Sequence, residues 1–455
     1  MPVLSNVEEI SEAISPSYTG SCAEFIVKVR VNFNAPILYL SFNELSSLPS
    51  GILGEMTMRF RILSLDGGGI RGLVSAYILQ EIETKLKENN KPPLREHFDM
   101  IAGTSTGSIL AAGIALGYPI KELIEIYETR GLEIFPYQKL FDMGRLKLLL
   151  KYGLSAPKFS NEGLINVLTN EPRFKKHDGS YVTMKEVGEV GQDGKHPIVV
   201  ILAYDTRYRN TTLFTNYHTP EEGSRWYNKI PLWQICVASA AAPTFFPAYE
   251  LKNYEESEKD GIKEEWSFPH VDGGVTANNP SLCAIARAIQ LGHKLEDISV
   301  LSIGTGENKK PMPFEKVEGW GLIQWGLRIS DVFMEGQAEI QSRICTQLMG
   351  GATSRRYLRL QFELNEAFDK PRNYLAQSPI LPKGKRHNFW TGQYIQESMD
   401  DARMENIKQL VEATKEYMNQ GNVFENRFEH YGSVGDEIEQ FILENPEPRK
   451  CIKKT

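Results

Sequence analysis

A serine between two glycines is the first feature of this sequence whose residue types could do chemistry. The segment Gly103-Thr-Ser-Thr-Gly107 follows an apolar run at residues 98–102, an expected strand, and precedes residues 108–116, an expected buried helix. A sharp strand-to-helix turn of this kind exposes the serine hydroxyl, so that a base can activate it as a nucleophile. The glycines permit the bend because they carry no side chain. The pattern alone also fits an ordinary turn that contains Ser105.

A second glycine-rich turn lies upstream, at Asp66-Gly-Gly-Gly-Ile-Arg-Gly72. It follows a strand-like run at residues 60–65 and leads into a helical stretch at residues 73–89. The backbone N–H groups of such a loop, together with a helix N-terminus, favour a bound anion. The glycine spacing is compatible with two such anions, the pyrophosphate of a dinucleotide or the oxyanion of an acyl-transfer reaction.

Three details favour the oxyanion. Residues 88–93 form a turn, where a dinucleotide fold would have an acidic residue at the end of a second strand. The sequence contains no Gly-x-x-x-x-Gly-Lys-Ser/Thr phosphate loop. Finally, the next expected strand leads to Ser105, and neighbouring parallel strands end on the same side of a sheet. The loop and the serine would then face each other across the carboxyl edge of the sheet.

The candidate proton acceptor for the serine is an aspartate rather than a histidine. The eight histidines lie in no distinctive local pattern. Asp272 ends an apolar strand and is followed by Gly273 and Gly274, which predicts an exposed turn. His270 would lie on the same side of that strand. However, a separation of roughly 6 to 7 Å along the backbone disfavours a direct proton relay between the two side chains.

The two glycine-rich turns and the Asp272-Gly-Gly274 motif occur in one order, with residues 238–247 between the serine and the aspartate. Together, across residues 59–306, they closely resemble the patatin-like phospholipase family. The resemblance implies that Ser105 is the nucleophile and that Asp272 is its partner in a Ser-Asp dyad without histidine. It also implies an oxyanion hole, with Arg71 nearby, made by the backbone amides of Gly67, Gly68 and Gly69.

The dyad requires a particular environment for its carboxylate. A free carboxylate titrates near pH 4 and is a weak base, so Asp272 must be partly buried and in hydrogen-bond contact with Ser105. The implied reaction is hydrolysis of a fatty-acyl ester through an acyl-Ser105 intermediate. We expect Asp66 to shape the glycine loop by accepting hydrogen bonds from the N–H groups that follow it.

Composition restricts the class of protein further. A net charge of −7 argues against general nucleic-acid binding, which requires a basic face. The five cysteines are widely spread without a Cys-x-x-Cys pair, and no metal-ligand cluster is visible, so we expect reduced thiols and neither a metal nor another cofactor. Without a secretory signal or a long apolar run, we expect a cytoplasmic protein that acts at membrane surfaces from the water side. Its expected substrates are membrane glycerolipids, either phospholipids or galactolipids.

Short apolar strands that alternate with helices predict an α/β fold, in which helices cover both faces of a mostly parallel sheet. We expect helical additions at the C-terminus, beginning with an amphipathic helix at residues 391–420. The N-terminal extension is either a small β element or an over-long start. The expected parts are this extension at residues 1–58, the core at 59–310, its completion by a helix and a strand at 311–364, a linker or wrapping loop at 365–390, and a helical region at 391–455.

Two classes of function remain open on the sequence. The first is a lipid acyl hydrolase, with a signal-gated defence phospholipase as a variant for which no sensor motif is seen. The second is a storage or binding protein on the same fold. The intact Ser105, Asp272 and loop glycines favour the enzyme.

Overall fold

The structure is a computed structural model in which the chain forms two units, Met1–Met58 and Arg59–Thr455. The N-terminal unit contains an antiparallel sheet of β1 (Glu9–Ala13), β2 (Ile26–Arg30) and β3 (Leu38–Ser41), in that order. The residues described are 9–13, 26–30, 38–41, 59–136, 145–188, 196–252, 258–259, 262–263, 266–321, 324–325, 328–367, 386–421, 423 and 432–443.

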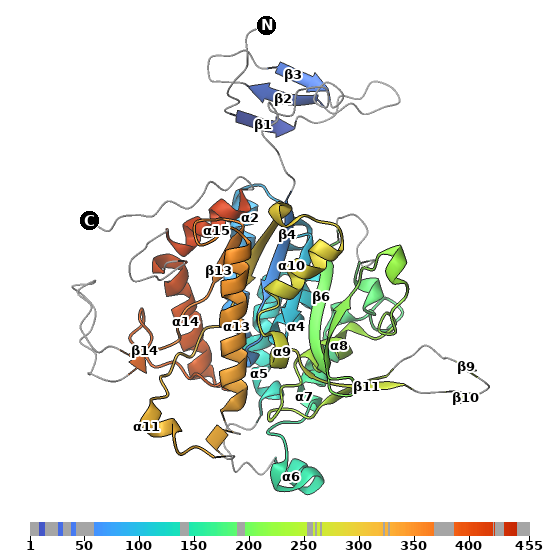
Figure 1. Ribbon diagram of the computed structural model, residues 1–455, viewed down its shortest axis with the longest axis vertical. Helices are drawn as coiled ribbons and strands as arrows, with labels where there is room; N and C mark the ends of the chain where they lie inside the picture. The colour runs from blue at the N-terminus through green and yellow to red at the C-terminus, as the bar shows by residue number, and fades with distance from the viewer. Residues whose placement is uncertain are drawn as a thin grey trace. The chain divides into compact units, whose positions relative to one another are not determined.

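The second unit is built on an eight-stranded sheet (Figure 1). Its first five strands are parallel to one another, while β11 is antiparallel to its neighbours β6 and β8, and β7 pairs antiparallel with β6. The strand order is β13 (Tyr357–Leu360), β12 (Ile298–Ile303), β4 (Phe60–Leu65), β5 (Met100–Thr104), β6 (Ile198–Asp205), β11 (Ser267–Asp272) and β8 (Tyr249–Lys252), with β7 (Asn210–Thr215) off this path.

The sheet separates two apolar cores, because alternate side chains of a strand face opposite sides. In β4, Leu63 and Leu65 belong to the larger core and Ile62 to the smaller one. Figure 1 shows α10 and α13 in front of the sheet. The expected mostly parallel sheet covered on both faces is therefore confirmed. The larger core is covered by α2 (Gly72–Glu88), α4 (Thr106–Ala115), α5 (Ile120–Ile134) and α8 (Leu232–Ser239), and the smaller core by α10 (Ser281–Gln290) and α13 (Ile329–Leu348).

Shorter elements complete the unit. None of the described helices is long and apolar enough to cross a bilayer. The additional helices are α3 (Leu94–His97), α6 (Leu146–Tyr152), α7 (Glu162–Asn170), α9 (Gly274–Ala277) and α11 (Phe314–Val317), and two small hairpins pair β9 (Glu258–Lys259) with β10 (Ile262–Lys263) and β14 (Glu366–Ala367) with β15 (Arg386–His387).

The C-terminal helices α14 (Met404–Gln420) and α15 (Val434–Ile442) pack against α2. The helix expected from residue 391 is wrong in its first part, since α14 begins only at Met404. Side-chain amides explain the difference, because they hold the preceding backbone in non-helical turns. Asn365 Oδ1 accepts from the Ile395 amide at 2.9 Å, and Asn406 Oδ1 accepts from the Gln396 amide at 3.1 Å. Most of the expected linker at 365–390, namely residues 368–385, lies outside the described residues.

The strand order reverses beside β4, because β5 and β6 follow on one side of it and β12 and β13 lie on the other. In open α/β sheets the crevice outside the carboxyl ends of the strands at such a switch point is where ligands bind. Both glycine-rich turns of the sequence follow the carboxyl ends of central strands, one after β4 and one after β5. The topology therefore brings the two turns to one edge of the sheet.

Candidate active site

Ser105 occupies a strained turn between β5 and α4. Its backbone angles are φ 54° and ψ −124°, in a region that residues with a side chain rarely adopt. The turn is tight, since a Cβ atom on Gly107 would lie 2.1 Å from the carbonyl oxygen of Leu65, and one on Gly103 would lie 2.3 Å from that of Gly107. The two glycines thus allow the close approach of three backbone segments. Ser105 is 6% exposed and lines a cavity.

Ser239 of α8 connects the serine turn to the end of β11. Its hydroxyl accepts a hydrogen bond from the Ser105 amide at 2.9 Å and donates one to the carbonyl oxygen of Leu202 at 2.6 Å. Its own carbonyl oxygen accepts from the Gly273 amide at 3.2 Å, while the carbonyl oxygen of Ala241 accepts from the Asp272 amide at 3.0 Å. The segment at residues 238–247 therefore fixes Ser105 and Asp272 relative to each other.

Asp272 is buried, with 1% of its surface accessible, as the dyad requires and not on an exposed turn as the two following glycines predict. The physical reason is that β11 runs antiparallel to β6, which places Asp272 opposite Ala203, inside the sheet. Its Oδ1 accepts a hydrogen bond from the Gly274 amide at 2.7 Å. Burial raises the pKa of Asp272 to about 6, while the Ser105 side chain and the Gly274 amide act in the opposite direction. At neutral pH the carboxyl group is mostly ionised and a better base than a free aspartate.

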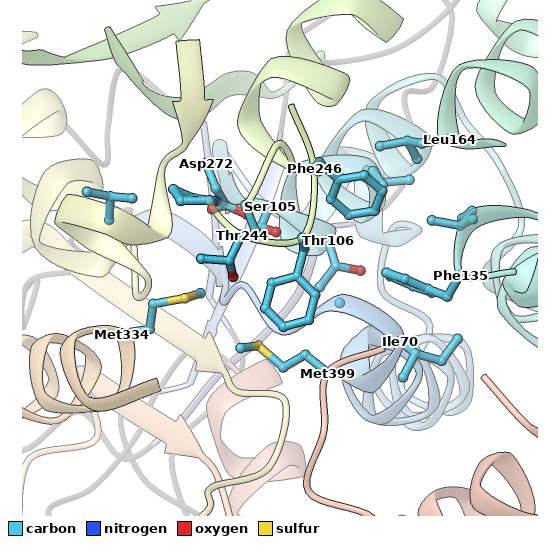
Figure 2. Close-up of a pocket in the computed structure, with 18 of the residues that line it drawn as sticks. Ile70, Ser105, Thr106, Phe135, Leu164, Thr244, Phe246, Asp272, Met334 and Met399 are labelled. Carbon is cyan, nitrogen blue, oxygen red and sulfur yellow. The ribbon is translucent and has the colours of Figure 1, made fainter. Parts of the chain in front are cut away.

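The second carboxylate oxygen of Asp272 is free for Ser105. Oδ2 is buried and has no hydrogen-bond partner of normal length among the described residues. The Ser105 side chain is nevertheless close enough to lower the pKa of Asp272, and Figure 2 shows the two side chains together at one end of the cavity. Hydrogen bonds between catalytic groups are often long in ligand-free structures and shorten when substrate binds. The geometry therefore suits proton transfer from the serine to Oδ2.

The glycine loop supplies fewer free amides than expected. The Gly67 amide, expected in the oxyanion hole, already donates to the carbonyl oxygen of Asn278 at 3.1 Å. The amides of Gly68 and Gly69 have no acceptor among the described residues. Gly69 lines the same cavity as Ser105 and has a φ of +59°. A Cβ atom there would lie 2.1 Å from the carbonyl oxygen of Met399.

Distant residues hold this loop in place. The carboxylate of Asp66 forms a buried, two-pronged ion pair with Arg359 of β13, with one N···O distance of 2.8 Å and the other of 2.5 Å. The expectation that Asp66 accepts from the glycine amides is therefore wrong. Instead, the carbonyl oxygen of Gly67 accepts from the Thr305 hydroxyl at 3.0 Å and from the Asn278 side-chain amide at 3.4 Å.

Arg71 lines a cavity other than that of the serine. It is buried, its Nη1 donates to the carbonyl oxygen of Glu397 at 3.4 Å, and it lines a second cavity of about 370 Å³ with Asp66 and Asn278. His270 does not line the cavity of Ser105 either, and its ring contacts the Thr212 hydroxyl at 3.1 Å. No described histidine lines the cavity of Ser105, and the described residues contain no cluster suited to a metal ion.

The cavity of about 230 Å³ that ends at Ser105 and Asp272 is apolar (Figure 2). Its wall combines segments that are far apart in the sequence. Thr244 belongs to the loop after α8 and has a strained φ of +72°. Met399 reaches the cavity from the irregular segment before α14. The apolar side chains of the wall include Ile70, Ile109, Ile134, Phe135, Leu164, Phe245, Phe246, Phe333, Met334 and Met399.

The sequence pattern did not identify several residues that build the site. Ser239 lies inside the segment that supported the family resemblance, so its position was a usable signal. Asn278 follows the Asp-Gly-Gly motif by only a few residues. By contrast, Thr305, Arg359 and Met399 occur in no local pattern, and only the folded chain brings them to the loop.

Comparison with known proteins agrees with the geometry. The family model described as patatin-like phospholipase matches residues 63–285, which include Ser105 and Asp272. Patatin-like protein 1 of Arabidopsis thaliana is 33% identical over 309 residues, covering 61% of this chain and 68% of that protein. A potato (Solanum tuberosum) protein described as a probable inactive patatin is 29% identical, covering 60% of this chain and 69% of that protein.

Coverage of the relatives is partial. Alignments with three further patatin-like proteins of Arabidopsis thaliana cover 63 to 64% of their length. Among solved structures, human GIVD cytosolic phospholipase A2 aligns with 12% identity and a TM-score of 0.40, covering 86% of this chain and 61% of that chain. The sequence relatives and the family model give one assignment: the chain belongs to the patatin-like phospholipase family.

Proposed function

We propose that the protein is a serine lipid acyl hydrolase that cleaves fatty-acyl esters of membrane glycerolipids with a Ser105–Asp272 dyad. The observation that carries the proposal is the buried, unpartnered Oδ2 of Asp272 beside a serine on a strained turn, at the end of an apolar cavity. Family membership supports a lipid hydrolase.

In the first half-reaction, the Ser105 hydroxyl gives its proton to Asp272 Oδ2 while its oxygen attacks the ester carbonyl carbon. The carbonyl oxygen becomes an oxyanion, which accepts hydrogen bonds from the Gly68 and Gly69 amides. When the tetrahedral intermediate collapses, the C–O bond of the ester breaks and the proton on Asp272 passes to the leaving alcohol. The products are a deacylated lipid and an acyl-Ser105 ester.

In the second half-reaction, Asp272 accepts a proton from water as the water oxygen attacks the acyl-Ser105 carbonyl. The same amides hold the second oxyanion. Its collapse breaks the bond to Ser105, which regains the proton from Asp272, and the fatty acid leaves. No step of this reaction requires a residue other than Ser105, Asp272, Gly68 and Gly69. A carboxyl pKa of about 6 allows Asp272 both to accept and to return a proton near neutral pH.

The cavity indicates which part of the substrate lies beside the dyad. Its wall is formed almost entirely by apolar side chains such as Phe135, Leu164 and Phe246. An acyl chain gains about 0.8 kcal/mol for each buried CH₂ group in such a place. We therefore place the fatty-acyl chain in the cavity and the polar part of a phospholipid or galactolipid outside it.

The test compares wild type, Ser105→Ala and the surface variant Ser224→Ala on a panel of phospholipids and galactolipids in the presence of EDTA. Released fatty acids are identified by mass spectrometry. We expect release by wild type and Ser224→Ala, none above background by Ser105→Ala, and covalent labelling of Ser105 by a fluorophosphonate in the first two only. Undiminished turnover by a folded Ser105→Ala protein would contradict the dyad. Absence of turnover and labelling in wild type would favour a storage or binding role, and loss on adding EDTA would contradict the metal-free reaction.

A further inference from the structure

Two exposed segments beside the cavity combine apolar and basic side chains. The first is α6, in which Leu146 and Leu150 are 50% and 79% exposed. They lie on one face of the helix because they are four residues apart. The buried Leu148 anchors the helix to the unit. A leucine side chain that is 79% exposed gains little hydrophobic stabilisation from the protein core, so it can bury its surface in a lipid bilayer instead.

Helix α6 carries two cations, and its neighbours Tyr152 and, less strongly, Glu162 raise the pKa of one of them, Lys151. Lys147 and Lys151 are exposed and four residues apart, and neither forms an ion pair with any described carboxylate. Tyr152, also exposed, lies under the Lys151 ammonium with its ring centre 4.9 Å away. Leucines, lysines and a tyrosine on one short helix are the composition of an element that lies at a membrane interface.

The second segment precedes α13. Its exposed large apolar side chains are Met312, Phe314 and Trp325, and Phe314 is 68% exposed. Among them stand three exposed cations, Lys310, Lys316 and Arg328, which form no ion pair with the described residues and outnumber the exposed acids of the segment, Glu315 and Glu318. The indole ring of Trp325 contacts that of Trp320 edge-on, with ring centres 5.2 Å apart. Tryptophan and basic side chains together again suit the boundary between water and lipid.

Both segments are attached to the wall of the cavity. The chain reaches α6 shortly after Ile134 and Phe135, which line the cavity from the end of α5. The other segment leads into α13, whose Phe333 lines the cavity while remaining 56% exposed and therefore lies at its mouth. Figure 1 shows α6 and α11 at the same end of the unit, the lower end in that view.

We propose that this surface, defined by Leu146, Lys147, Leu150 and Lys151 of α6 together with Lys310, Met312, Phe314, Lys316, Trp325 and Arg328, docks the protein on anionic bilayers. The inference rests on the proposed function, because a lipid acyl hydrolase must take its substrate from a bilayer. Charge complementarity selects the partner. The whole chain has a net charge of −7, which repels an anionic membrane, whereas the free cations of this surface attract one. Docking would bring the mouth at Phe333 to the lipid surface.

The experiment separates docking from hydrolysis. All proteins carry Ser105→Ala, so that vesicles stay intact, and are sedimented with vesicles of phosphatidylcholine alone or mixed with phosphatidylserine. The apolar variant is Leu146→Ser with Leu150→Ser, and the charge variant is Lys147→Glu with Lys151→Glu. Matched controls are Ile289→Ser with Met404→Ser and Lys87→Glu with Lys294→Glu, which alter exposed residues elsewhere in the unit. The same substitutions are also made in the protein that retains Ser105, and these variants are assayed on a soluble short-chain ester.

We expect tight binding only to vesicles that contain phosphatidylserine. The charge variant should lose roughly thirtyfold in partitioning, from two lost cation contacts, and the apolar variant at least about tenfold, while the controls and soluble-ester turnover stay unchanged. The proposal would be overturned if the Ser105→Ala protein did not bind vesicles, if its binding did not depend on phosphatidylserine, or if both α6 variants retained that binding. If vesicles are bound as expected but no protein hydrolyses the soluble ester, docking stands and the proposed hydrolase function fails.

Discussion

The two walls of the active site are built in different ways. The serine wall is mainly local, since the turn of Ser105 depends on Gly103 and Gly107 and on the strand and helix directly attached to it, with a hydrogen bond to the distant Ser239 in addition. The other part of the site, called the opposite wall below, consists of the glycine loop that faces the serine and of Asp272, whose side chain lies beside Ser105; contacts across the chain fix both. The clearest is the ion pair between Asp66 and Arg359, which are 293 residues apart in sequence.

The difference shows how the site divides two tasks. A nucleophile needs one strained conformation, and short-range close contacts can impose it. An oxyanion hole and a base need a fixed position relative to that nucleophile, which only elements from elsewhere in the fold can supply. We therefore expect substitutions in the opposite wall to change the catalytic rate more than they change the stability of the local fold.

The largest effect is expected from Asp272→Asn. The amide keeps the shape of the side chain and can still accept from Gly274, but it cannot take the proton of Ser105. We expect kcat/KM for a lipid ester to fall roughly 10³-fold, within the range for loss of a general base. Thermal unfolding at pH 7 should occur at the same or a higher temperature, because a buried charge is removed. A loss below tenfold would show that another group accepts the proton.

Gly69→Ala should have the next largest effect. Gly69 has a φ of +59°, and the added Cβ would collide with the carbonyl oxygen of Met399. The loop must therefore shift, and its amides would no longer point at the oxyanion. Loss of one oxyanion donor lowers kcat by about 10²- to 10³-fold. The matched control is Gly292→Ala, which has a φ of +96° and nothing within 4 Å.

The control should be destabilised by about 1 kcal/mol without a change in kcat. Steady-state kinetics and chemical denaturation of both variants make the comparison. Equal loss of kcat in Gly69→Ala and Gly292→Ala would show that backbone strain alone, and not the oxyanion donors, explains the effect.

Local patterns predicted the serine wall well. The strand predicted at residues 98–102 and the helix predicted at 108–116 correspond to β5 (Met100–Thr104) and α4 (Thr106–Ala115), and the turn at Ser105 follows from glycines and apolar runs that are adjacent in sequence. Periodicity and turn chemistry act over a few residues, so they can be read without the fold. The order of the motifs, from which the family was inferred, can also be read from the sequence without the fold.

The opposite wall was predicted less well, for a physical reason. Two glycines after Asp272 predict an exposed turn, yet antiparallel pairing with β6 buries the carboxylate. The apolar spacing of residues 391–403 predicts a helix, yet side-chain amides from Asn365 and Asn406 hold the backbone otherwise and deliver Met399 to the loop. The burial of Asp272 and the non-helical segment before α14 both depend on residues distant in sequence, so no local pattern predicts them.

The pH dependence should show opposite trends for activity and stability. With a pKa of about 6, Asp272 loses most of its ionised form below pH 6, so kcat/KM should fall about tenfold from pH 7 to pH 5. The folded-state pKa lies above the ordinary aspartate value, so the native state binds this proton more tightly than the unfolded state. This group therefore adds up to about 3 kcal/mol of stability as the pH falls from 7 towards 4.

The difference in unfolding free energy between wild type and Asp272→Asn isolates that contribution from the other acidic groups. We expect the variant to lose the pH 4 to 7 trend that wild type has from Asp272. Identical pH trends in the two proteins would mean that the carboxyl titrates near its ordinary value, and the dyad would then lack a base suited to neutral pH.

Ser239→Ala should give the smallest effect, although it alters a residue that contacts both walls. Loss of the hydroxyl removes its hydrogen bonds to the Ser105 amide and to the Leu202 carbonyl oxygen and leaves the buried amide without this partner, which costs about 1 to 3 kcal/mol of stability. The carbonyl oxygen of Ser239 still accepts from the Gly273 amide, so Asp272 keeps its place. We expect kcat to fall by less than about tenfold with KM unchanged, because Ser105 is only loosened. Ser224→Ala, at the surface, should change neither quantity. A drop in kcat as large as that of Asp272→Asn would show that the serine turn is not a locally determined structure and depends on α8 as much as the opposite wall depends on β13.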